Sequence, residues 1–217
     1  MMRKRFAFLA LPTLTLLAAT TVLPAARPTR IAAVARDDKG KPHAADLIQQ
    51  SRGGATFEIG YLDAAARRAA IRSALGRDLD LLPGKVDELH RGYVVFVLRV
   101  TNNSGEDLLF NPGHARLASD KQDVSMALDY SALYEGTHRL GPTAPTLEEM
   151  GSILFDREAT VRPGGSVRKL LAFEAPREDR FRELTVRLLE INLGAESFDV
   201  VFPFRKFPVA EAGDRKQ

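Results

Sequence analysis

The sequence GYVVFVLRVTNNSGEDLLF, Gly92 to Phe110, decides the fold class. It joins an apolar, β-branched run to the polar cluster Asn102 to Asp107 and then to a second apolar run. β-Branched and aromatic residues favour strands, whereas Asn, Ser, Gly and Asp tolerate tight reversals of the chain. Similar units recur as far as Phe207. Together they predict an all-β fold, an antiparallel β-sandwich.

The run Tyr93 to Val100 is apolar on both faces of the predicted strand. One parity holds Val94, Phe96, Leu98 and Val100, and the other holds Tyr93, Val95 and Val97. Such a strand needs cover on both sides. The alanine-rich segment Ala64 to Leu75 predicts a helix, capped by Asp63 and ended by Gly76, that supplies the outer cover.

Two further local signals mark irregular elements. Thr146 and Glu149 form a capping-box pattern that predicts a short helix from Leu147 to about Ile153. A phase change in the apolar pattern predicts a bulge near Leu188 and Leu189. The predicted core comprises Phe96, Leu98, Val100, Val124, Met126, Leu171, Phe173, Val200 and Phe202.

The first residues have the layout of an export signal. Arg3, Lys4 and Arg5 precede an apolar run, and small residues follow down to Ala26. We expect residues 1–26 to be a signal peptide and the mature chain to be periplasmic or secreted, with no stable membrane insertion after its removal. An uncleaved anchor is the alternative, since Phe6 to Leu23 lies near the lower length limit for crossing a bilayer.

The remaining sequence divides into three parts. Residues 27–54 lack clear periodicity and predict a flexible lead-in. Residues 55–208 form the predicted sandwich, and residues 209–217 form a polar tail.

Charge and cysteine content narrow the class of protein. The chain has a net charge of +3, but Arg3, Lys4 and Arg5 hold the only charges before Arg27, so the mature part is neutral. Nothing in this balance predicts a nucleic-acid partner. The chain has no cysteine, so an exported form depends on its core and not on disulfides.

Two segments, YVVFVLRVTNNSGEDL and EATVRPGGSVRKLLAFEAP, resemble the bacterial exported immunoglobulin-like (telokin-like) domains. In that family a strand ending in V-T-N-x-S precedes a turn, and a later L-x-P-G-x-S turn leads into a strand ending in Phe. Val161 replaces the leucine here and keeps the position apolar. The resemblance covers about Thr56 to Phe207. It implies an immunoglobulin-like sandwich that binds, spaces or presents, with no catalytic residue.

Motifs for catalysis or metal binding are weak. His43, His90, His114 and His138 lie far apart, without the close spacing of zinc ligands, and no metal or cofactor is predicted. Ser166 and Lys169 match the S-x-x-K pattern of serine acyl enzymes. On a predicted strand, however, residues three apart point to opposite faces, so this match is a coincidence.

The strongest candidate site is the excursion Asp129 to Asp156, where the β pattern lapses. Connections longer than about 12–15 residues are uncommon in compact domains and are often functional. Its predicted binding residues are Tyr130, Tyr134, His138 and Arg139, because tyrosine and arginine favour recognition surfaces. The alternative is that these side chains only pack the excursion onto the sandwich.

These observations predict an exported, non-catalytic binding or interaction domain with a protein or cell-envelope partner. One alternative is an envelope hydrolase that uses a pair among Glu148, Glu149 and Asp156. Another is a purely structural spacer in the envelope.

Overall fold

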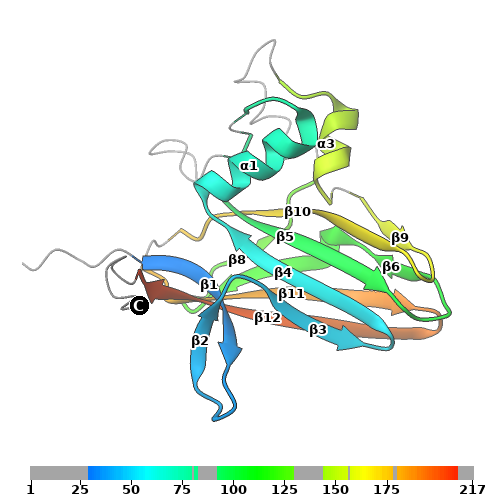
Figure 1. The fold of residues 1–217 in the computed structure, drawn as a ribbon, viewed down its shortest axis with the longest axis horizontal. Helices are drawn as coiled ribbons and strands as arrows, with labels where there is room; N and C mark the ends of the chain where they lie inside the picture. The colour runs from blue at the N-terminus through cyan, green and yellow to red at the C-terminus, as the bar shows by residue number, and fades with distance from the viewer. Residues whose placement is uncertain are drawn as a thin grey trace, which may run out of the picture.

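A computed structural model describes residues 29–79, 81–82, 92–129, 144–155, 157–177 and 180–209. In it two antiparallel β-sheets face each other, and two helices cover the outer face of one sheet (Figure 1). This arrangement confirms the predicted all-β sandwich with two short helical insertions. Within the described ranges, no helix is long and apolar enough to cross a membrane.

The two sheets draw their strands from distant parts of the chain. The larger sheet contains β1 (Thr29–Arg36), β2 (Pro42–Ala45), β6 (Leu108–Phe110), β7 (Ala115–Ser119), β8 (Val124–Met126), β9 (Ala159–Val161), β11 (Glu183–Leu193) and β12 (Glu196–Pro208). Its order is β2-β1-β12-β11-β6-β9, and β7 joins β11 to β8. The smaller sheet contains β3 (Ile48–Arg52), β4 (Ala55–Leu62), β5 (Tyr93–Asn102) and β10 (Ser166–Glu174), in the order β10-β5-β4-β3. A 3-10 turn, η1 (Pro112–His114), joins β6 to β7.

Both helices have the predicted bounds, α1 (Ala64–Leu75) and α3 (Leu147–Ile153). The Ala66 N–H donates to the Asp63 carboxylate at 2.8 Å, and Gly76 ends α1 with a φ of 69°. A left-handed residue at this position favours glycine. α3 begins in the predicted capping box of Thr146 and Glu149. Local capping therefore fixes both helices as the sequence predicts.

β5 is the predicted strand with two buried faces, and it lies between β4 and β10. Its side chains Val94, Phe96, Leu98 and Val100 enter the sandwich core. Val95 and Val97 enter a second cluster, the helix layer, between the smaller sheet and the two helices. The other buried members of the helix layer are Ile71, Leu79, Leu81, Leu82, Met150, Ile153, Leu154, Leu170 and Ala172. The expected helical cover of β5 is thus confirmed.

Seven of the nine predicted core residues are buried, but Val124 and Met126 are not. Their exposed fractions are 64% and 54%. The reason is the register of β8 on β7, which sets Ser125 opposite the buried Leu117. Ser125 therefore shares the inward face, and its two neighbours fall on the outer face. The alternation in β8 is predicted correctly, but the prediction of which face is buried is wrong.

The predicted bulge in β11 is present. The register of β11 on β12 shifts between Leu188 and Ile191, both of which are buried. Between them Glu190 has a φ of 54°, and its N–H donates to Asp199 Oδ1 at 3.0 Å. The extra residue lets apolar side chains of opposite parity reach the same core.

The prediction of a flexible lead-in at residues 27–54 is wrong for residues 29–54, which contain β1, β2 and β3. β1 pairs with β12, with Ala33 opposite Phe204, and Ala32 and Ala33 are buried. Small alanines give a weak alternation signal, and the partner strand lies at the far end of the chain. The sandwich therefore begins earlier than residue 55.

Candidate functional site

The four predicted binding residues, Tyr130, Tyr134, His138 and Arg139, lie outside the described residues. Of the excursion Asp129 to Asp156, the structure describes Asp129 and residues 144–155. The candidate site is therefore built from these described ends and from the strands that they contact.

Both described ends of the excursion are fixed to the outer edge of β10. Before it, the Leu128 N–H donates to the Ala172 carbonyl at 2.8 Å. Near its end, the Phe155 N–H donates to the Leu170 carbonyl at 2.9 Å, and Leu154 forms a parallel bridge with Leu170. The chain thus contacts neighbouring positions of one strand just before the excursion and again near its end.

A groove opens where the excursion rejoins the sandwich, between α3, β9 and β10. It has a volume of about 570 Å³. This edge groove is lined by Leu147, Glu148, Gly151, Phe155, Arg157, Glu158, Ala159, Val167 and Lys169. Its walls combine apolar side chains with two acidic and two basic residues, and the exposed fraction of Leu147 is 46%.

The individual elements that form the edge groove can be predicted from the sequence, but their meeting in space cannot. α3 presents Leu147 and Gly151 one turn apart on a capped helix. The Lys169 ammonium donates to the Gly151 carbonyl and links β10 to α3. The available signal was Leu147, an apolar residue in the first turn of a short helix; its partners on β10 lie too far along the chain to be inferred.

Glu149, one of the predicted hydrolase acids, has structural partners. Its carboxylate accepts from the Thr146 N–H at 2.7 Å and from Arg77 Nη2 at 2.7 Å. The Thr146 backbone donor, with the nearby Arg77 charge, holds the pKa of Glu149 below its usual value although partial desolvation opposes this. Of the other two predicted acids, Glu148 lines the edge groove and Asp156 lies outside the described residues.

The S-x-x-K match lies on a strand, as predicted, and its two side chains have separate partners. Ser166 Oγ lies 3.1 Å from Thr101 Oγ1 on β5. Lys169 instead contacts the Gly151 carbonyl of α3. No serine–lysine pair forms here.

The histidines are also separated. His43 is exposed on β2, and His114 Nδ1 lies 2.9 Å from Glu190 Oε2, while His90 and His138 lie outside the described residues. Among the residues that can be placed, no three histidine, aspartate or glutamate side chains group as metal ligands.

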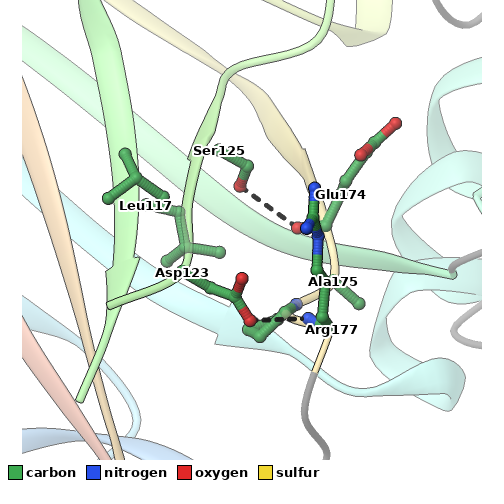
Figure 2. A pocket seen from close by; sticks show the side chains of 8 residues that line it. Leu117, Asp123, Ser125, Glu174, Ala175 and Arg177 are labelled. Atoms are coloured by element: carbon green, nitrogen blue, oxygen red, sulfur yellow. Dashed lines mark hydrogen bonds between the residues drawn. The ribbon is translucent and has the colours of Figure 1, made fainter. Parts of the chain in front are cut away.

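A smaller hollow of about 60 Å³ lies where β8 meets the end of β10 (Figure 2). The Ser125 hydroxyl donates to the Glu174 carbonyl at 3.2 Å, and the Arg177 N–H donates to Asp123 Oδ2 at 2.8 Å. Figure 2 shows these contacts joining the two sheets. The hollow is small and its polar groups bond to one another, so we interpret it as a structural junction.

A third hollow, of about 350 Å³, lies between β1, β4 and the start of α1. Burial raises the pKa of the Tyr61 hydroxyl there, with a smaller opposing effect of Arg67. Asp63 caps α1, and Arg30 pairs with Asp46 at 3.4 Å. Because these carboxylates have structural partners, the larger edge groove is the stronger candidate.

Comparison with known proteins identifies no family. No family model matches the chain, and no curated protein matches it. The yjhA protein from Bacillus subtilis has a similar structure at a TM-score of 0.36 and 14% identity, over 65% of this chain and 76% of that chain. A functionally unknown protein from Listeria monocytogenes EGD-e is similar at a TM-score of 0.38 and 12% identity, over 83% and 86% of the two chains. Likenesses of this strength bear neither on family nor on function.

Proposed function

We propose that this chain is a non-catalytic binding domain that acts in the periplasm or outside the cell, with the edge groove as its contact surface. The observation that carries this proposal is the groove itself, a hollow of about 570 Å³ where the excursion rejoins the sandwich. Sites for small-molecule ligands usually have about 300–1,000 Å³ and mainly apolar walls with a few polar groups. Leu147 and Val167 supply the accessible apolar surface, and the buried Phe155 lines the same groove.

The hydrolase alternative has less support. Acid–base hydrolysis needs two carboxyl groups free to exchange protons with a substrate. Glu149 instead accepts bonds from Thr146 and Arg77, and its lowered pKa favours the charged form that these donors bind. The resemblance to exported immunoglobulin-like domains also favours binding over catalysis.

The test is capture of partners from envelope extracts of the native host, with the immobilised chain and quantitative mass spectrometry. Leu147→Glu places a charge in the groove at the first turn of α3, where a carboxylate is compatible with the helix. Val201→Glu is the matched control, since Val201 on β12 is 43% exposed and lies outside the groove. Circular dichroism and melting temperature confirm that both variants fold.

We expect the wild type and Val201→Glu to capture the same proteins and Leu147→Glu to lose them. Equal capture by all three would remove the groove from the proposal. A Tyr130→Ala, Tyr134→Ala variant then tests the rest of the excursion. A wild type that captures nothing above bare beads would favour the spacer.

A further inference from the structure

The backbone N–H and C=O groups of successive β10 residues point alternately toward β5 and toward the outer edge of the sheet. At its ends, the Asn102 N–H donates to the Gly165 carbonyl at 2.9 Å and the Ala175 N–H donates to the Gly92 carbonyl at 2.8 Å. In an antiparallel pair, every second residue exchanges hydrogen bonds with the partner strand. Odd-numbered residues of β10 therefore bond to β5, and even-numbered residues direct their N–H and C=O groups to the outer edge.

The chain itself covers much of this outer edge. The carbonyls of Glu174, Ala172 and Leu170, all even-numbered, accept hydrogen bonds from Ser125 Oγ, the Leu128 N–H and the Phe155 N–H. Ala127 approaches β10 in the antiparallel direction and Leu154 in the parallel direction. The edge therefore accepts extended backbone of either direction.

Arg168 is the next even-numbered residue, and it lies beyond the covered part. Within the part of the chain that the structure describes, no hydrogen bond to its backbone N–H or C=O is present. It is exposed, and its neighbours Val167 and Lys169 line the edge groove. An unpaired donor and acceptor on an exposed strand edge form a template for another strand.

We propose that the edge groove binds an extended peptide segment of a protein partner, which adds as a strand to β10 at Arg168. The peptide backbone pairs with the N–H and C=O of Arg168, and one apolar side chain enters the groove beside Leu147 and Val167. Strand addition of this kind takes affinity from main-chain bonds and specificity from the pocket beside them. The peptide continues the edge that residues 125–128 and 154–155 already use. This inference rests on the proposed function and specifies the class of partner.

The test uses dodecapeptides selected from a random phage-displayed library on the full chain. Enriched peptides are then measured against the wild type, Arg168→Ala and Arg168→Pro. Arg168→Pro removes an N–H that does not bond to β5, as is tolerated on an edge strand. Arg168→Ala removes the side chain and keeps the N–H, so it is the matched control.

We expect Arg168→Pro and Leu147→Glu each to weaken peptide binding by about tenfold or more, and Arg168→Ala to change it by less than about threefold. Amide hydrogen exchange on the wild type gives a readout that does not depend on variants. Bound peptide should slow exchange of the Arg168 N–H by about tenfold or more and leave that of Val167, which faces β5, unchanged.

Two results would overturn strand addition. One is a library that yields no peptide enriched on the wild type over Leu147→Glu. The other is peptide binding that depends on Leu147 while exchange at Arg168 stays unchanged. In the second case the groove binds by another mode, so the proposed function stands and the strand-addition mode fails.

Discussion

Phe96 lies at the centre of the sandwich core. It is fully buried, and its ring centroid is 4.7 Å from that of Phe204 and 6.0 Å from that of Phe173. Since Phe204 belongs to the larger sheet, Phe96 joins the two sheets directly. We expect Phe96→Ala to lower the free energy of unfolding by about 3–5 kcal/mol.

Urea denaturation measures this loss, and Met126→Ala is its control. Met126 is 54% exposed, so its truncation should change the free energy of unfolding by less than about 0.5 kcal/mol. A loss below about 1 kcal/mol for Phe96→Ala would contradict the central position of this ring.

Asn102 is a buried polar residue at the turn that ends β5. Its amide nitrogen donates to the carbonyls of Glu106 and Val161, each at 2.7 Å, and its amide oxygen accepts from the Ser104 hydroxyl at 2.6 Å. One side chain thus joins β5 to its own turn and to β9. Asn102 is the asparagine of the V-T-N-x-S pattern. The pattern has a physical reason here, because a side-chain amide supplies the two donors and the acceptor that this position uses.

Asn102→Asp replaces the two donors by a carboxylate oxygen that faces two carbonyls. We expect a loss of about 3 kcal/mol or more in the free energy of unfolding, because the new buried carboxylate oxygen faces two carbonyl acceptors and has no donor. The neighbouring exposed residue gives the control, Asn103→Asp, which should stay close to the wild type in the same urea titration. Similar losses for both variants would show that charge in the turn, and not the buried amide, matters.

The stability of the N-terminus of α3 should depend on pH through Glu149, which belongs to its capping box. Its folded-state pKa lies below the usual value of 4.5, chiefly because the Thr146 N–H binds the carboxylate. A group with a lowered folded pKa stabilises the fold above its unfolded pKa, and this contribution is lost as the pH falls through the folded pKa. We expect Glu149→Gln to lower the melting temperature at neutral pH, with a difference from the wild type that shrinks below about pH 4.5.

Melting curves between about pH 7 and pH 3 check this expectation. Glu148→Gln is the matched control, since Glu148 is the adjacent glutamate and accepts neither the Thr146 nor the Arg77 bond. A difference for Glu149→Gln that stays constant with pH would contradict the role of its ionised carboxylate.

Elements with local signals could be predicted from the sequence. α1 and α3 are fixed by residues within one turn of their ends, Asp63, Gly76, Thr146 and Glu149. The bulge in β11 could be predicted because the apolar parity changes within the strand itself. In each case the energetic cause and the sequence signal lie within a few residues of each other.

Features that depend on distant partners could not be predicted from the sequence. β1 is a strand because it pairs with β12, and its small buried alanines give no clear alternation. The alternation of β8 predicts a strand, but its inward face follows from the pairing of Ser125 with Leu117. The edge groove could not be predicted for the same reason, because it forms only where α3, β9 and β10 meet.

The molecule has two separate apolar layers, and the one beneath the helices is the smaller. The sandwich core lies between the sheets, and the helix layer lies between the smaller sheet and the helices. α1 contributes one fully buried apolar side chain, Ile71, to the helix layer. The edge groove borders α3, so its shape depends on this smaller layer.

This arrangement predicts that the helix layer opens before the sandwich. Truncation of Ile71 removes the apolar anchor of α1, at a cost of roughly 2–4 kcal/mol. In Ile71→Ala we expect the amides of α1 to exchange at least about tenfold faster than in the wild type, while those of β11 and β12 change little. Phe96→Ala is the comparison, because Phe96 contacts Phe204 of β12 directly and its loss should speed exchange in both layers. Uniform acceleration across all strands and helices in Ile71→Ala would mean that the molecule opens as one cooperative unit, with no separately mobile layer beside the groove.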